Sequence, residues 1–291
     1  MLGKLFKYEF RAVGKTCGFL LIVAFCVTIL GAVYLLSPLF EGIVNPKGQM
    51  GEMGPGLSVI SVILGILGLL SYAVMLIAIS FGFTLWLSLR FYRSMYSDQG
   101  YLTHTLPVKP VHVLVAKVVT GGLCMLILSI ALYAMVLFLV LLGAAKVLDL
   151  SMGELLHSFQ VNVKFFLDVI KEQAGISFTG SGVIFLISLF LTPFTTVSII
   201  FGSLTLGQYS WKNKGLMGII AYLIVRVAMK FVSGIVGLAM TVLQISQPVG
   251  FASSVMRANG SSLGTLAINL IFAVALFFWS IHVVQNRLNL E

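Results

Sequence analysis

Apolar residues recur in six long runs along the chain. The runs cover residues 16–39, 57–89, 118–142, 183–206, 216–243 and 263–284. A helix needs roughly 20 apolar residues to cross a bilayer, and every run reaches that length. The second run has 33 residues without a charge, about 50 Å of helix, and no polar turn divides it. The pattern predicts six membrane-spanning helices, of which the second tilts strongly or projects beyond the membrane.

The composition agrees with this pattern. Hydrophobic residues make up 59% of the 291 residues and charged residues 9%, whereas about 25% of a soluble domain is charged. Such a chain cannot cover a soluble core with charge, so a soluble enzyme, a disordered tail and a nucleic-acid-binding domain are excluded. We expect an all-α, multi-pass integral membrane protein in which residues 1–291 form a single domain surrounded by membrane lipids.

The lysines and arginines outside the spans predict the orientation. With the N-terminus in the cytoplasm, eleven of them lie on the cytoplasmic side and five lie outside. An excess of Lys and Arg is typical of cytoplasmic segments, so both termini are predicted to be cytoplasmic. The first apolar run is too long for a cleaved signal peptide and is expected to remain as an anchor and first span.

Residues 1–15 have the pattern of an amphipathic interface helix that lies on the cytoplasmic leaflet. Four cations spaced three or four residues apart share one face: Lys4, Lys7, Arg11 and Lys15. Glu9 falls among the apolar residues of the opposite side. We expect Glu9 either to pair with Arg90 or Arg93, or to reach the interface alone.

Residues 90–117 form the main predicted cytoplasmic segment, which is polar yet rich in aromatic residues and leucine. Residues 97–100, Ser-Asp-Gln-Gly, have the composition of a cap and turn. Two interpretations are open. The segment is either an interfacial turn that joins two spans or a docking element whose anchors for another protein are Tyr96, Tyr101 and Leu102.

Residues 143–182 are predicted to lie outside the cell. Ser151 and Glu154 have the spacing of a capping box, and apolar residues follow at helical spacing, which indicates an external helix of about 20 residues. This helix is either a packing lid or a substrate contact. Residues 244–262 connect the last two spans outside, with or without a short helix that dips back into the membrane.

Arg226 and Lys230 are cations within the fifth run, four residues apart and hence on one helix face. They either line a watery cavity that attracts an anionic group, or Lys230 snorkels to the interface and Arg226 meets backbone carbonyls. Thr195 and Thr196 in the fourth run mark either a conduit wall or helix-packing contacts. These four residues are the candidate translocation path.

The sequence contains no catalytic or metal-binding motif. The motif GxxxxGK[ST], which cradles ATP phosphates, is absent, and so is HExxH. The four histidines are scattered, and the three cysteines fall inside apolar runs. We therefore predict that the chain is not an enzyme and carries no metal or cofactor of its own.

The run SDQGYLTHTLPV, together with the lysine that begins the third span, resembles the segment between the second and third spans of ABC-2-type transporter permeases, especially the small Gram-positive ones. A run S/N-D-E-G-Y-L-x-x-T-L-P-V recurs in that family. The matching residues are Ser97, Asp98, Gly100, Tyr101, Leu102, Thr105, Leu106, Pro107, Val108 and Lys117. Gln99 stands where the family commonly has an acid. The N-terminal KLFKYEFRA is similar to the family's opening interface helix.

The resemblance implies a permease subunit of an ATP-driven exporter in a bacterial cell membrane. In the family, the segment that matches residues 90–106 contains a coupling helix that fits a separate ATPase subunit, where ATP and Mg²⁺ bind. Two permease chains, identical or different, join two ATPase chains. The substrate expected from this resemblance is hydrophobic or amphipathic: a lipid, a peptide antibiotic or a drug.

The resemblance also implies roles for individual residues. The ATPase contact would comprise Ser97, Asp98, Gln99, Gly100, Tyr101 and Leu102, with Arg93 as a supporting charge. Glu9, between Lys7 and Arg11, would lock the interface helix to the bundle. Two other functions stay open on the residues alone: a secondary carrier or channel, motivated by Arg226 and Lys230, and a non-transporting scaffold or sensor partner.

Overall fold

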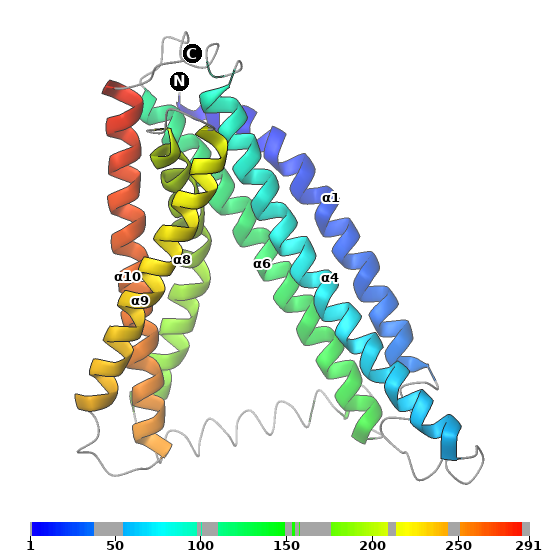
Figure 1. Cartoon of the computed structure of the whole chain (residues 1–291). Coiled ribbons are helices and arrows are strands. Elements are labelled where there is room, and N and C mark those ends of the chain that lie inside the picture. Colours follow the sequence, from blue (N-terminus) through cyan, green and yellow to red (C-terminus); the bar gives the residue numbers. More distant parts are fainter. Residues whose placement is uncertain are drawn as a thin grey trace. The chain divides into compact units, whose positions relative to one another are not determined.

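A computed structural model describes residues 2–37, 55–97, 100, 110–148, 153–154, 157, 176–208, 214–243 and 251–286. These residues form six long helices, and no strand occurs among them (Figure 1). The helices are α1 (Leu2–Leu36), α4 (Pro55–Tyr96), α6 (Pro110–Leu148), α8 (Ile176–Gly207), α9 (Lys214–Leu243) and α10 (Phe251–Asn286). Each helix contains a segment long and apolar enough to cross a membrane. The prediction of an all-helical, multi-pass membrane protein is confirmed at this level.

The helices reach further than the apolar runs. Helix α4 has 42 residues, about 63 Å, and is one unbroken helix as expected. It continues to Tyr96, and α6 already begins at Pro110, so both ends of the predicted cytoplasmic segment 90–117 are helical. Hydropathy marks only the part of a helix that suits lipid. Backbone hydrogen bonding continues until a turn interrupts it, and a proline is favoured at the first helical position.

Two predicted short helices are parts of longer ones. Helix α1 runs without interruption through residues 15 and 16, where we expected an interface helix to give way to a span. No proline separates the two parts, and residues on both sides favour helix. Residues 251–262, for which a short dipping helix was left open, form the first turns of α10, and residues 244–250 lie outside the described residues. The predicted external helix lies outside the described residues, apart from residues 153, 154 and 157.

The chain divides into two compact units. The first unit comprises residues 1–14, 85–126 and 167–291, and the second comprises residues 15–84 and 127–166. In the first unit, α8, α9 and α10 lie side by side (Figure 1). Their shared core consists of Ile199, Met229, Ala273 and Leu276. Apolar side chains from all three helices therefore meet at one seam.

Small residues bring the helices of the first unit close together. A Cβ atom added at Gly202 of α8 would lie 2.5 Å from the Cβ of Leu276 in α10. Gly207 of α8 and Gly218 of α9 bring their backbones into direct contact. Ser198 Oγ donates a hydrogen bond to the carbonyl oxygen of Ala273 at 3.0 Å. These features are typical of helix packing in membranes, where small residues allow backbones to approach.

In the second unit, α1, α4 and α6 pack through aromatic rings laid on glycines. Leu35 and Leu139 are the buried centre of this packing. The ring of Tyr34 covers Gly68, where an added Cβ would lie 2.6 Å from the ring. The Tyr34 hydroxyl donates to the Gly65 carbonyl at 2.5 Å. The aromatic rings hold α1 and α4 together without any charged group.

Candidate functional site

Glu9 of α1 is bound by cations from two other helices. Lys117 Nζ of α6 lies 2.6 Å from Glu9 Oε1, and an Arg90 Nη atom of α4 lies 3.3 Å from Glu9 Oε2. Lys117 also donates to Ser94 Oγ at 3.0 Å. We call Glu9, Arg90, Ser94 and Lys117 the charge cluster. It ties three helices of the first unit at one carboxylate.

The charge cluster is enclosed by apolar side chains. Lys117 is 7% exposed, and Val13, Phe91 and Phe201 line the space beside it. Arg90 is less buried, and its guanidinium lies 5.6 Å from the centre of the Trp86 ring. A buried cation needs a paired acid because desolvation of the charge is costly. Glu9 supplies that acid for Lys117.

The charge cluster has no room for a ligand. The cavity at its centre measures about 10 Å³, which is at most the space of one water molecule. Among the described residues, no group of three or more His, Cys, Asp or Glu side chains is placed to hold a metal ion. The charge cluster joins α1, α4 and α6 through hydrogen-bonded ion pairs.

The end of α4 is also fixed to α8. The rings of Phe91 and Phe201 stack with centroids 3.8 Å apart. The hydroxyl oxygens of Tyr96 and Thr205 lie 2.7 Å apart. Thr205 already donates to the Phe201 carbonyl, so Tyr96 is the donor in this pair. One end of α4 thus contacts α1 and α6 through charges and α8 through aromatic side chains.

A tight turn follows α4. Ser97 Oγ donates to the Arg93 carbonyl at 2.7 Å, and Gly100 N donates to the Ser97 carbonyl at 2.6 Å. A Cβ atom at position 100 would lie 2.6 Å from the Met95 carbonyl oxygen. Glycine is therefore required here because the chain folds back on the last turn of α4. This agrees with the turn predicted at residues 97–100.

The structure describes only part of the predicted ATPase contact. Arg93 is exposed at the end of α4, Ser97 is half-buried and Gly100 is buried. The remaining four predicted residues, Asp98, Gln99, Tyr101 and Leu102, lie outside the described residues. Tyr96 was expected as an anchor for another protein. Its hydroxyl bonds Thr205 within the chain, and its role as an anchor stays a prediction.

The residues of the predicted interface helix differ in exposure according to the helix face on which they lie. Lys7 and Arg11 are exposed, whereas Glu9 is half-buried. Of the alternatives left open for Glu9, the structure shows the pairing with Arg90. The contact with Lys117 was not predicted, although Lys117 is 108 residues away in sequence and makes the shorter ion pair. The only sequence signal was an acid on an apolar helix face, which requires cations but does not say which ones.

The four residues of the candidate translocation path lie on α8 and α9. Arg226 Nε of α9 donates to the Tyr222 hydroxyl at 2.9 Å, and its guanidinium lies 5.2 Å from the centre of the Tyr222 ring. Arg226 is therefore accommodated by a phenol one turn away rather than by backbone carbonyls. Lys230 is exposed, and Thr195 of α8 donates to the Thr192 carbonyl at 3.0 Å. Thr196 is half-buried beside it.

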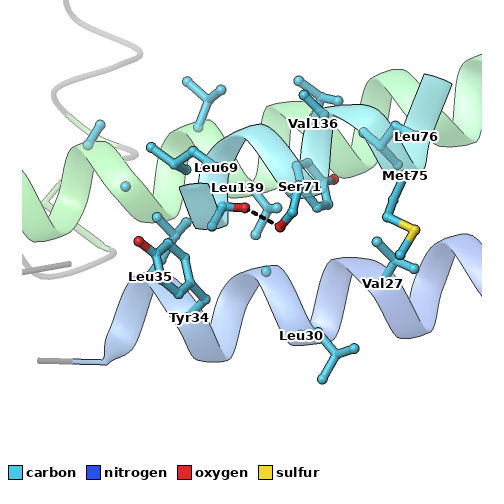
Figure 2. Close-up of a pocket in the computed structure, with 17 residues that line it drawn as sticks. Val27, Leu30, Tyr34, Leu35, Leu69, Ser71, Met75, Leu76, Val136 and Leu139 are labelled. Carbon is cyan, nitrogen blue, oxygen red and sulfur yellow. Dashed lines mark hydrogen bonds between the residues drawn. The ribbon is translucent and has the colours of Figure 1, made fainter. Parts of the chain in front are cut away.

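A larger cavity lies between α1, α4 and α6 in the second unit. Its volume is about 590 Å³, and aliphatic side chains such as Leu30, Leu69 and Val136 form most of its wall (Figure 2). Sequence reasoning missed this cavity. None of the four residues of the candidate translocation path lines it or the space beside Glu9.

The comparisons with known proteins give no relative. No protein-family model, no curated protein and no solved structure matches the chain.

Proposed function

We propose that this chain is the membrane-spanning permease subunit of an ATP-binding cassette transporter. A separate ATPase subunit would bind ATP and Mg²⁺, and a second permease chain would complete the complex. The resemblance of the run SDQGYLTHTLPV to ABC-2-type permeases favours export of a hydrophobic or amphipathic substrate across a bacterial cell membrane. Six apolar helices suit such a subunit.

The observation that carries the proposal is the set of contacts that hold the C-terminal end of α4. The resembling run begins at Ser97, directly after the last residue of α4, Tyr96. Over its last two turns α4 is held to α1, α6 and α8 by the charge cluster, the Phe91–Phe201 stack and the Tyr96–Thr205 hydrogen bond. A force applied to the segment after Tyr96 would therefore move several helix ends together.

Burial makes these contacts suitable for transmitting movement. Lys117, Phe91 and Thr205 are all at most 7% exposed, so they pack against fixed neighbours. Packed side chains of this kind resist continuous deformation and shift as a body. ATP-driven closure of the partner would push on residues 97–102, and the joined helix ends would follow.

The charge distribution supports the orientation that this function requires. An even number of spans places both termini on one side. The segments on that side carry eleven of the eighteen lysines and arginines, which favours the cytoplasm. The segment after Tyr96 then faces the compartment that holds ATP.

Binding of an ATPase tests the proposal. The tagged full chain would be purified from its native membranes, and co-purifying proteins that contain a Walker A motif would be quantified. We expect such an ATPase with the wild-type chain and at least about tenfold less with Asp98→Ala plus Tyr101→Ala, because these residues are the proposed anchors. The matched control, Asp168→Ala plus Tyr133→Ala, should retain it.

Each alternative function predicts a different result. Retention of the ATPase by the Asp98 and Tyr101 variant would overturn the assignment of the contact. Transport by the purified chain in vesicles without any ATPase would instead support a secondary carrier or channel. Absence of both binding and transport would support a scaffold or sensor partner.

A further inference from the structure

We propose that the cavity between α1, α4 and α6 holds one acyl chain of a membrane phospholipid. The inference does not depend on the proposed transport function, because it uses only the second unit. The cavity volume of about 590 Å³ lies within the range of roughly 300–1,000 Å³ of pockets that enclose small ligands.

The cavity lies within membrane-spanning segments and is elongated along them. Its wall follows α1 from Val27 to Leu35, roughly 12 Å along the helix axis. The lining parts of α4 and α6 also belong to segments able to cross a membrane. Residues on its rim, including Leu30, Met75 and Val140, are more than half exposed. In a membrane protein these apolar rim residues face the hydrocarbon of the bilayer.

The polar groups of the wall do not point to a polar ligand. Tyr34 donates its hydroxyl hydrogen to the Gly65 carbonyl. Figure 2 shows that Ser71 donates to the Gly68 carbonyl at 2.8 Å. The hydroxyl oxygen of Tyr72 is covered by protein, so Tyr72 offers ring carbon atoms to the cavity. A polar ligand would leave its own groups unpaired here, and water does not remain in such apolar spaces.

The cavity is preformed by glycines. An added Cβ at Gly31 would lie 2.9 Å from a Leu139 methyl group and 3.2 Å from the Tyr72 ring. At Gly68 the same atom would meet the Tyr34 ring. At both positions only a glycine leaves room for the neighbouring side chains. Gly143 differs, because a Cβ there would approach only the methyl groups of Leu35, at 4.0 Å.

The surroundings of the cavity favour a lipid chain as its occupant. Lipid tails are as apolar as leucine and already surround the rim. An empty space of this size would leave its lining without packing contacts, which a hydrocarbon chain restores.

Photolabelling tests the inference. The purified full chain would be placed in phosphatidylglycerol and phosphatidylethanolamine vesicles that contain a phospholipid with a diazirine on one acyl chain. Labelled peptides would be mapped by mass spectrometry. We expect labelling of residues 27–35, 68–76 and 136–144 at least about threefold above residues 183–190 of α8, which contain the exposed Val183, Phe185 and Leu186 and serve as the reference for bulk lipid.

Substitutions that fill the cavity distinguish labelling by an acyl chain bound there from labelling by bulk lipid. Gly143→Leu should lower the cavity labelling about fivefold relative to the reference, and Ala73→Leu serves as a second filling variant if the first does not fold. Gly82→Leu is the matched control, because nothing lies within 4 Å of a Cβ there. It should leave the labelling unchanged, as should Tyr72→Phe.

Three results would overturn the inference. The first is equal labelling of the cavity segments and the reference. The second is cavity labelling that neither filling variant reduces. The third is cross-linking of the cavity segments to a second copy of the chain in place of lipid, which would make this face an interface between copies.

Discussion

The two units are built from opposite kinds of contact, although α1, α4 and α6 run through both. In the first unit, the described part of α4 meets its neighbours through a carboxylate, two cations and paired hydroxyls. In the second unit, the same helix meets α1 and α6 through tyrosine rings, glycines and leucines. The first arrangement fixes helix ends in one geometry, and the second leaves a large apolar space.

The difference follows from the free energy that it costs to break or rearrange each kind of contact. A buried ion pair is costly to break, because separation leaves charges without partners. Apolar packing in lipid has many near-equivalent alternatives, because lipid tails replace side chains at little cost. One helix can therefore be rigid at its end and adaptable where it borders lipid. Four predictions test this contrast.

The largest effect is expected from Glu9→Leu. This change leaves Lys117 buried without an acid, so we expect a loss of about 3–5 kcal/mol in the free energy of unfolding. Denaturation of the purified chain by SDS in mixed micelles would measure it. Adding Lys117→Met should recover at least about 1.5 kcal/mol, since the unpaired cation is then gone. A loss below about 1 kcal/mol for Glu9→Leu would mean that the charge cluster does not hold the helices.

Glycine substitutions compare the packing of the two units. Gly202→Ala should cost about 2–3 kcal/mol, because the added methyl group meets both Cβ and backbone atoms of Leu276. Gly68→Ala should cost about 1–2 kcal/mol, because it meets a side-chain ring that can shift. Gly82→Ala is the control and should stabilise by up to about 1 kcal/mol through helix propensity. A larger loss of stability for Gly68→Ala than for Gly202→Ala would contradict this difference between the two units.

Removing the Tyr96 hydroxyl tests the link between α4 and α8. Tyr96→Phe should destabilise the chain by about 1 kcal/mol, because it deletes the hydrogen bond to Thr205 inside the first unit. The same SDS titration measures it. Tyr133→Phe, at an exposed tyrosine of α6, is the matched control and should change stability by less than about 0.5 kcal/mol. Equal effects of the two changes would show that the hydrogen bond contributes nothing.

The smallest effect is expected from Tyr72→Phe in the second unit. The Tyr72 hydroxyl oxygen is buried without a hydrogen-bond partner, so its removal should stabilise the chain by up to about 1 kcal/mol. Thermal unfolding in detergent would detect the rise. The sign is opposite to that of Tyr96→Phe, although the chemical change is the same. A destabilisation would imply that the hydroxyl has a partner.

The fold could be predicted from the sequence more completely than the side-chain contacts that join the helices. Six helices follow from six apolar runs, because lipid imposes a length and a composition on each span. The Glu9–Arg90 pair was among the alternatives that the sequence left open, because an acid on an apolar face requires a cation. Lys117 and Thr205 could not be assigned, because their partners lie about a hundred residues away and only packing brings them together.

The cavity could not be predicted either. Its walls consist of residues that are ordinary in any membrane helix, and no single position marks it. Gly31, Gly68 and Gly143 carry no common spacing that separates them from glycines elsewhere in the spans. Their role depends on which neighbour each one faces: a leucine and a tyrosine, a tyrosine, or only the methyl groups of a leucine at 4.0 Å.

ATP hydrolysis in reconstituted vesicles tests the central proposal most directly. The co-purified ATPase would be assayed with the wild-type chain and with Asp98→Ala plus Tyr101→Ala. The proposal predicts several-fold stimulation by the wild-type chain and loss of at least about nine-tenths of that stimulation in the variant. Equal hydrolysis rates with the two chains would contradict the proposal that the segment after α4 couples this membrane protein to an ATPase.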